Sequence, residues 1–282
     1  MTHLFQNEPG AQGTGAVTDS RKIKLAIDTI AGAINEHNPI QVYALVSGGN
    51  DSTVAGHLAA RLGPGVDAFV HINTGIGVEQ TRAYTRDFAR WLETPLIEKF
   101  APKSYEDLVM KYGFPGPGAH RYMYIWLKER ALREVRKEAQ QGQNRRVMFI
   151  TGVRDSESKR RMGHIEYVKR EGNIVWVAPI RDFDHHDIWE YRDMFQLPRN
   201  EVVEILHMSG ECLCGAFAKP KELEWLSLWY PDVANRIRHL EKRAHDAGLQ
   251  RWHWGPQSSR KLRKAPGPLC SGCADDGDSI SR

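Results

Sequence analysis

Hydrophobic residues recur along the first 200 residues at spacings typical of helices and of short buried strands. Residues 21–37 place isoleucine and leucine broadly along one face of a helix. Short apolar runs then alternate with helical patterns: strands are predicted at 41–47, 66–75 and 95–100, and helices at 51–62 and 78–92. Parallel strands need crossover connections and are buried on both faces, so they have short, continuously apolar sequences. This order therefore predicts an α/β fold with a parallel sheet and helices on both faces.

The same alternation continues toward the C-terminus and then gives way to a helical pattern. Helices are predicted at 104–112 and 119–141, separated by the turn-rich GFPGPG segment at 113–118, followed by a strand at 145–152, one or two strands in 171–181, and helices from 185 to the first cysteine. We divide the chain into a flexible leader (1–20), a nucleotide-binding α/β domain (21–205) and a C-terminal basic, helical subdomain (206–282).

Composition is that of a globular protein, with 41% apolar and 26% charged residues. The sequence contains no run of 18 uncharged apolar residues, which excludes a membrane span. Residues 1–20 have neither an apolar core nor a basic start, so they are not expected to be a secretory signal. We expect a cytoplasmic protein with no membrane partner.

The sharpest polar cluster, Ser47-Gly48-Gly49-Asn50-Asp51-Ser52, lies between a predicted strand and a predicted helix. Gly48 and Gly49 allow a tight turn, and the N–H groups of such a loop and of the following helix form a cradle for phosphate oxygens. Ser47 and Ser52 add hydroxyl donors. Asp51 suits either a helix cap or a Mg²⁺ ligand acting through water. The segment is neither a Walker loop nor a GxGxxG dinucleotide motif.

The SGGxDS pattern resembles the PP-loop of ATP pyrophosphatases, and later segments resemble the phosphoadenosine phosphosulfate (PAPS) reductase family within that superfamily. Asn73-Thr74-Gly75 is similar to the family's DTG turn beside adenosine, with Asn73 in place of the acid. Residues 151–161 resemble its G-[IV]-R-x-x-E-S-x-x-R signature, and residues 179–189 its PI-x-x-W-x-x-x-D-[IV]-W segment, with Phe183 in place of Trp. The resemblance covers about residues 40–215. It implies a Rossmann-like, HUP-type sheet that binds ATP or PAPS with Mg²⁺.

Basic residues follow the predicted strand at 145–152, at the same sheet edge as the loop. Arginine forks bind phosphate or sulfate oxygens, although Glu157 and Arg161 also suit a salt bridge within a helix start. The candidate residues fall into three groups. Catalytic residues are Ser47, Asp51, Ser52 and Arg154; nucleotide-binding residues are Ser47–Ser52, Asn73, Thr74, Gly75, Gly152 and Arg154; substrate or phosphate contacts are Arg121, Glu157, Lys159, Arg160, Arg161 and Lys219.

All four cysteines lie in the last third of the chain, as Cys212-x-Cys214 and Cys270-x-x-Cys273. Disulfides are not expected in a reducing compartment, and the spacing suggests four ligands of one metal centre. Soft thiolates suit Zn²⁺ or an iron–sulfur cluster, and the spacing alone leaves both open. The resemblance favours [4Fe–4S], because assimilatory sulfonucleotide reductases and the sulfur-activating enzymes of DNA phosphorothioation carry a Cys₄-bound cluster. Zn²⁺ is the alternative.

PAPS reductases use a further cysteine in a C-terminal tail as the nucleophile, and this chain has no fifth cysteine. We therefore predict an ATP-dependent, pyrophosphate-releasing sulfurtransferase, similar to the phosphorothioation enzymes, that takes sulfur from the cluster or from a partner such as a cysteine desulfurase. One rival is a sulfonucleotide reductase that releases sulfite. A second rival is a non-catalytic nucleotide- or nucleic-acid-binding module.

Residues 236–264 carry nine Lys/Arg and two Asp/Glu, a net charge of +7. This segment suits a nucleic-acid acceptor, and a solvated helix surface is an equally valid interpretation. We expect the nearby tryptophans Trp225, Trp229, Trp252 and Trp254 to pack a helical subdomain around the metal rather than to stack on bases.

Overall fold

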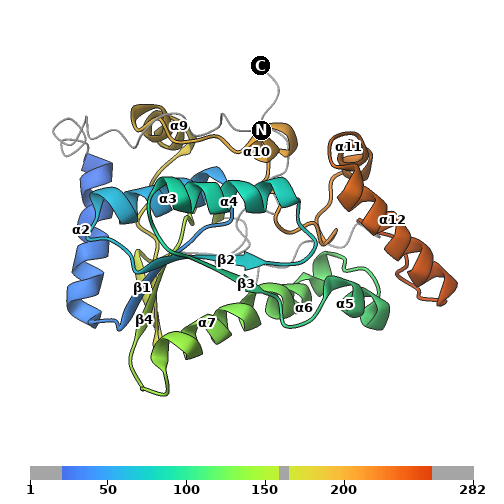
Figure 1. The fold of residues 1–282 in the computed structure, drawn as a ribbon, viewed down its shortest axis with the longest axis horizontal. Coiled ribbons are helices and arrows are strands. Elements are labelled where there is room, and N and C mark those ends of the chain that lie inside the picture. Colours follow the sequence, from blue (N-terminus) through green and yellow to red (C-terminus); the bar gives the residue numbers. More distant parts are fainter. Residues whose placement is uncertain (1–20, 159–164, 256–282) are drawn as a thin grey trace.

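The computed structural model describes residues 21–158 and 165–255 and is built around one six-stranded sheet (Figure 1). The strand order is β3-β2-β1-β4-β6-β5. All neighbouring strands are parallel except β5 and β6, which pair antiparallel. The strands are β1 (Gln41–Leu45), β2 (Ala68–Asn73), β3 (Leu96–Phe100), β4 (Val147–Ile150), β5 (Val168–Glu171) and β6 (Ile174–Val177).

Helices connect the strands and continue beyond the sheet. Those up to β4 are α2 (Arg21–His37), α3 (Asn50–His57), η1 (Leu58–Leu62), α4 (Glu79–Trp91), α5 (Tyr105–Tyr112), η2 (Pro117–Ala119), α6 (His120–Tyr124), η3 (Ile125–Glu129) and α7 (Arg130–Gln140). The later helices are α8 (Asp155–Ser158), α9 (His185–Met194), α10 (Glu201–Leu206), α11 (Glu222–Trp229) and α12 (Pro231–Asp246).

Both faces of the sheet are covered, because alternate residues of each strand point to opposite sides. On β1, Val42 and Ala44 belong to a core shared with α2, α3, α4 and α9. Tyr43 and Leu45 belong to a second core with α7 on the other face. Figure 1 shows these helices as separate layers above and below the strands. The predicted α/β sheet with helices on both faces is confirmed.

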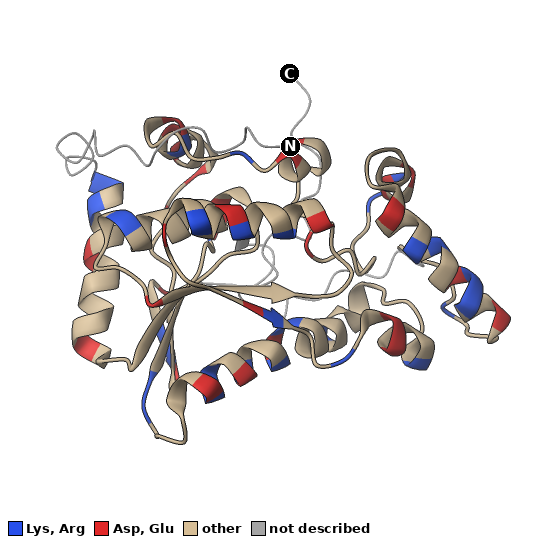
Figure 2. Cartoon of the chain, viewed as in Figure 1, with Lys and Arg blue, Asp and Glu red and all other residues tan. Residues whose placement is uncertain are grey.

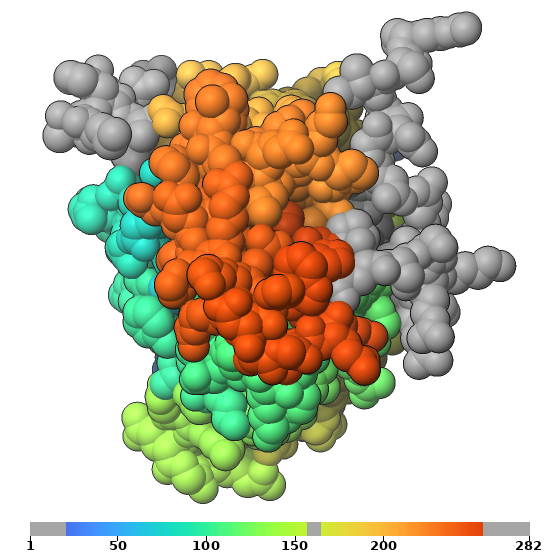
Figure 3. Space-filling model, turned by 90° about the vertical axis from the view of Figure 1, so that its right-hand side faces the viewer, coloured from blue at the N-terminus to red at the C-terminus, as the bar shows by residue number. Residues whose placement is uncertain are grey.

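A third core lies beyond the sheet and joins two distant parts of the sequence. It contains Tyr105 of α5, Met123 of α6, Leu226 of α11 and Ile237 of α12, together with Trp254. Figures 1 and 3 show α11 and α12 lying beside the α5–α6 region. The C-terminal helices therefore share a core with residues that we had predicted to belong to the nucleotide-binding domain.

The predicted elements match the structure closely at most positions, and the main difference is at the sheet edge. The segment 171–181 contains β6, but its antiparallel partner β5 begins upstream at Val168. Gly172 forms the turn between them with φ +61°. The side chains of β5 are mostly exposed, so this edge strand lacks the apolar pattern of a buried one. No helix in the described ranges is long and apolar enough to cross a membrane.

Candidate active site

The loop between β1 and α3 adopts the turn that the sequence predicts. Gly48 has φ +79°, and a Cβ there would lie 2.7 Å from Cγ2 of Thr81, so both conformation and space require glycine. Gly49 precedes the helix, and no side chain caps the first turn. The N–H groups of Asn50, Asp51 and Ser52 therefore point from a helix N-terminus with no side-chain cap, an arrangement that favours an anion.

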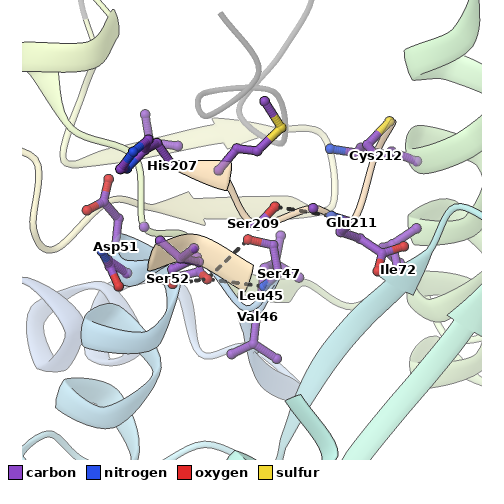
Figure 4. Close-up of a pocket in the computed structure, with 18 of the residues that line it drawn as sticks. Leu45, Val46, Ser47, Asp51, Ser52, Ile72, His207, Ser209, Glu211 and Cys212 are labelled. Carbon is purple, nitrogen blue, oxygen red and sulfur yellow. Dashed lines mark hydrogen bonds between the residues drawn. The ribbon is translucent and has the colours of Figure 1, made fainter. Parts of the chain in front are cut away.

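Ser47 and Ser52 stabilise this loop through hydrogen bonds inside it. The Ser52 hydroxyl donates to the carbonyl of Gly49 at 2.9 Å and accepts from the Ser47 N–H at 3.1 Å. The two hydroxyl oxygens lie 3.2 Å apart, and Figure 4 shows them together at the base of a cavity. Loss of either hydroxyl would loosen the turn as well as remove a donor.

The end of β4 fits against the loop backbone. A Cβ on Gly152 would lie 2.6 Å from the carbonyl carbon of Asp51 and from the amide nitrogen of Ser52. Arg154 follows, buried, with its Nε 2.9 Å from Oδ2 of Asp51. The predicted grouping of Asp51, Ser52, Gly152 and Arg154 is therefore present. Asp51 is not a helix cap, because Gly49 holds that position and Asp51 lies in the first turn.

Two residues that were not predicted from the sequence, Asn200 and Arg192, form hydrogen bonds to the loop. Asn200 donates from Nδ2 to the carbonyl of Gly48 at 2.9 Å. Arg192 of α9 donates from Nη1 to Oδ1 of Asn50. Neither residue belongs to a sequence motif that would mark it as functional, and both are far from the loop in sequence. Only the folded arrangement of α9 and α10 reveals them.

A cavity of about 270 Å³ opens beside the loop. Its lining includes the loop residues Ser47, Asp51 and Ser52, the β4 end with Gly152 and Arg154, and the segment from His207 to Ala218. Figure 4 shows Ser209 next to the loop residue Ser47, with Cys212 farther from the loop serines. Lys128 and His185 also line it and were not predicted. One cavity thus brings together the predicted phosphate loop and the first cysteine pair.

The segment that carries Cys212 and Cys214 is fixed to the carboxyl end of β2 by Glu211. The Glu211 carboxylate lies 3.1 Å from Nε2 of His71 and accepts from the Thr74 N–H at 2.8 Å. A Cβ on Gly77 would lie 2.4 Å from the Glu211 carbonyl oxygen, so glycine is needed for this close approach. Burial opposes ionisation of Glu211, but His71 and Arg82 outweigh it and lower the Glu211 pKa below its ordinary value. Burial likewise opposes protonation of His71, but Glu211 outweighs it and raises the His71 pKa.

The thiols of Cys212 and Cys214 suit two ligands of a soft metal. Cys214 is buried, Cys212 is half-buried, and both line the cavity. The backbone around them is held by Tyr105, whose hydroxyl donates to the Cys214 carbonyl at 2.8 Å, and by Trp254, whose Nε1 donates to the Leu213 carbonyl at 2.9 Å. No group of three or more His, Cys, Asp or Glu that could hold a metal occurs among the described residues. Cys270 and Cys273 lie outside them.

The predicted turn at 73–75 makes its side-chain hydrogen bonds within the protein, and its contact with a nucleotide stays a prediction. Asn73 donates from Nδ2 to Glu98 at 2.8 Å and accepts from the Gly75 N–H at 2.9 Å. Thr74 is fully buried and donates to the carbonyl oxygen of Glu211. Within the described ranges, none of these three residues lines the cavity.

The remaining predicted contacts divide into exposed residues and residues outside the described ranges. Arg121 and Lys219 are exposed and are not among the cavity residues of the described chain. Lys159, Arg160 and Arg161 lie outside the described ranges, as do residues 1–20 and the part of the basic segment beyond Gly255. Glu157 lies in α8, and its predicted contact with Arg161 stays a prediction.

The tryptophans behave differently from the prediction. Trp254 is packed, at 8% exposure, but Trp225, Trp229 and Trp252 are 53%, 56% and 41% exposed. Three of the four therefore present aromatic surface to solvent instead of filling the C-terminal core. Figure 2 shows that Lys and Arg on α12 are mixed with acidic residues.

Fold and loop together define a HUP-type nucleotide-binding α/β protein. The family model described as the phosphoadenosine phosphosulfate reductase domain matches residues 41–206. The chain belongs to this family, which is part of the PP-loop superfamily of adenine-nucleotide α-hydrolase-like enzymes.

Several solved structures are similar to the chain at low sequence identity, and the first of them supports the same fold. The PAPS reductase of Candida auris, solved with phosphate, is 16% identical with a TM-score of 0.50, and the match covers 69% of this chain and 89% of that one. The FMN adenylyltransferase of Candida glabrata with FAD and pyrophosphate is 14% identical with a TM-score of 0.48, covering 72% and 64%. The NMN synthetase of Francisella tularensis is 17% identical with a TM-score of 0.40, covering 78% and 94%. No curated protein sequence matches significantly.

Proposed function

We propose that the chain is an ATP-dependent sulfurtransferase that adenylates an acceptor oxygen, releases pyrophosphate and uses a Cys₄-bound iron–sulfur cluster. The observation that carries the proposal is the shared cavity. Ser47–Ser52 supply a phosphate cradle, and Cys212 and Cys214 supply thiols, in the lining of one space. A sulfur-transfer site beside an activated nucleotide needs this combination.

The loop would hold the polyphosphate of ATP. The amides of Asn50, Asp51 and Ser52 would donate to phosphate oxygens, and the N-terminus of α3 would favour their charge. Mg²⁺ prefers oxygen ligands, and Asp51 within the loop offers a carboxylate for it. Arg154 now pairs with Asp51 at 2.9 Å, and a bound phosphate would give its guanidinium a second anionic partner.

The reaction would proceed by attack at the α-phosphorus. An acceptor oxygen forms a new P–O bond, the bond to the bridging oxygen of the β-phosphate breaks, and pyrophosphate leaves. The loop amides and Arg154 stabilise the charge that builds up on the leaving group. A sulfur nucleophile then attacks the activated acceptor, and AMP departs with the acceptor oxygen.

Four thiolates, Cys212, Cys214, Cys270 and Cys273, would hold the cluster. When bound, it supplies inorganic sulfide or electrons next to the nucleotide. Tyr105 and Trp254 would keep the first pair in place through their bonds to the backbone at Cys214 and Leu213.

A nucleic acid is the acceptor that we favour, and a sulfur-carrying protein such as a cysteine desulfurase is the donor. Support comes from the exposed Arg238, Lys242 and Arg243 of α12 and from the exposed Trp225 and Trp229 of α11. Cations neutralise phosphates, and exposed aromatic rings can stack on bases.

A sulfonucleotide reductase remains the second candidate, because the family model that matches residues 41–206 describes that activity. It would bind PAPS, or the corresponding phosphosulfate, in the same cavity and release sulfite. A non-catalytic module would bind nucleotide and release neither product.

One experiment separates the three. The full chain is purified without oxygen and supplied with Mg²⁺ and either ATP or PAPS, together with single-stranded DNA or RNA, a cysteine desulfurase, cysteine and a dithiol reductant that can supply the two electrons needed to form sulfite from PAPS. The proposal expects pyrophosphate from ATP and no sulfite from PAPS. Sulfite from PAPS would establish the reductase instead, and neither product would establish the module.

The cluster has its own test. Iron, sulfide and zinc are measured in the anaerobically purified chain and in Cys212→Ser and Cys270→Ser, with Ser227→Ala as a control away from the cavity. We expect iron with equal sulfide in the wild type and the control, and loss of both in each cysteine variant. A colourless protein that holds zinc would refute the cluster.

A further inference from the structure

We propose that Arg192 is a positioning residue that gives the phosphate loop its preference for polyphosphates, acting through Asn50. Arg192 belongs to α9 and is 4% exposed. Its Nη1 donates to Oδ1 of Asn50, and its Nη2 donates to the carbonyl of Pro198 at 3.1 Å. Its Nε is buried and has no hydrogen-bond partner among the described residues. A buried guanidinium thus lies directly behind a residue that lines the nucleotide cavity.

The charge of Arg192 has no carboxylate partner in the described structure, although its guanidinium carbon lies 5.6 Å from the centre of the Trp189 ring. Arg154, the other buried arginine at the loop, has Asp51 at 2.9 Å. No carboxylate of residues 21–158 or 165–255 lies within 4 Å of the Arg192 nitrogens. The nearby acids Asp193 and Glu204 pair with Arg199 instead, each at 3.6 Å. Asp51 is paired with Arg154, so Arg192 is a buried arginine beside the loop with no carboxylate partner among the described residues.

An unbalanced buried cation is costly unless an anion approaches it. Burial lowers the pKa of Arg192, but a guanidinium stays protonated in proteins, so the charge persists. The cost of this burial is offset when phosphate charge enters the adjoining cavity, which makes binding of a polyphosphate more favourable than binding of a neutral ligand. The inference rests on the proposed nucleotide site and names what makes that site selective.

Arg192 also determines how Asn50 can contact a ligand. Because Oδ1 of Asn50 accepts from Arg192, the Nδ2 group is left as the donor that this side chain can offer to the cavity. A loop whose side-chain amide presents its N–H₂ group matches an acceptor-only phosphate. Arg192 thus contributes both a long-range charge and a fixed orientation.

The test measures binding of ATP and of adenosine to the full chain by calorimetry, at two salt concentrations. Arg192→Gln removes the charge and keeps a hydrogen-bonding amide, Arg192→Lys keeps the charge, and Arg199→Gln removes a half-exposed arginine that is already paired. We expect Arg192→Gln to weaken ATP binding about tenfold and to leave adenosine binding within about twofold. Arg192→Lys and Arg199→Gln should keep the wild-type ratio of ATP to adenosine affinity within about threefold. The salt dependence of ATP binding should also decrease in Arg192→Gln.

Equal weakening of ATP and adenosine in Arg192→Gln would show a purely structural role and overturn the inference, as would unchanged ATP binding. If Arg192→Gln does not fold, Arg192→Lys decides, because an ATP-to-adenosine ratio that falls tenfold there would contradict a role for the charge. A wild type that binds no ATP would instead refute the proposed function, so the two failures are distinguishable.

Discussion

At the scale of single residues, the site depends on close contacts that only glycine allows. Gly152 touches the backbone of Asp51 and Ser52, so the carboxyl end of β4 supports the phosphate loop directly. The conformation of the phosphate loop therefore depends on its contact with the segment that follows β4.

Gly152→Ala should displace the loop, because the new Cβ would lie 2.6 Å from backbone atoms that cannot rotate away. We expect a loss of about 1–3 kcal/mol in unfolding free energy and at least tenfold weaker ATP binding. Urea unfolding and calorimetry measure the two. Gly32→Ala is the matched control, since nothing lies within 4 Å of that position in α2, and it should stabilise the protein slightly. Normal ATP binding in Gly152→Ala would contradict the role of this contact.

Site residues could be predicted from the sequence where several of them lie close together in one motif. Ser47–Ser52, Gly152 and Arg154 come together as predicted. Arg192 and Asn200 could not be predicted, because a single arginine or asparagine in a helical region has no distinguishing pattern. Asn73 and Thr74 were assigned from a family turn; their side chains bond Glu98 and Glu211, and their contact with a nucleotide stays a prediction.

At the scale of elements, α3 connects the loop to the core on one face of the sheet. His57 at its C-terminal end is buried, with its Nδ1 2.8 Å from the Tyr191 hydroxyl of α9. Its ring also lies 5.9 Å from that of Trp91 and 5.0 Å from that of Phe195, measured between centroids. The helix that begins at the phosphate loop is thus held at its other end by aromatic packing.

His57 should make the stability of the protein depend on pH. Burial, with a smaller contribution from Arg61, lowers its pKa from 6.5 to about 3. The unfolded chain therefore binds a proton below about pH 6.5 that the folded chain refuses until about pH 3. Stability should be full above pH 6.5 and fall by up to about 1.4 kcal/mol per pH unit as the pH decreases.

Urea unfolding of wild type and His57→Gln between pH 7.5 and 5 measures this effect. The glutamine can still bond Tyr191 but does not titrate. The variant should be less stable at neutral pH and should lose less stability on acidification. Parallel stability curves for the two proteins would show that His57 is not the responsible group.

Elements were predicted well wherever periodicity is strong. The helix at 21–37 has the predicted ends, and the four parallel strands from β1 to β4 lie within their predicted ranges. The antiparallel strand β5 was missed because its sequence, Val-Lys-Arg-Glu, has a polar edge-strand character with no apolar alternation. Its pairing with β6 comes from the sheet and not from a local preference.

At the scale of the whole molecule, the C-terminal helices share a core with α5 and α6, and the segment that precedes them, from His207 to Ala218, lines the cavity. Their core includes residues of α5 and α6, and Trp254, near the end of the described chain, packs into the same core. This arrangement could not be read from the sequence, because it depends on contacts between segments more than 100 residues apart, such as the bond from Tyr105 to Cys214. Substitutions that disrupt this core should therefore both destabilise the fold and displace the segment that carries Cys212 and Cys214.

Trp254→Ala should lower the unfolding free energy by about 3–5 kcal/mol, because it removes a packed ring and leaves the Leu213 carbonyl without its donor. Trp252→Ala, at an exposed position, should cost less than about 1 kcal/mol. Chemical unfolding of both variants measures the difference. Equal effects would mean that Trp254 does not hold this core together.

The most direct test of the account is a crystal structure of the full chain with Mg²⁺ and a non-hydrolysable ATP analogue. The account predicts the phosphates against the amides of Asn50, Asp51 and Ser52, with the guanidinium of Arg154 on a phosphate oxygen. A nucleotide bound elsewhere, or a loop that stays empty at saturating concentration, would contradict it.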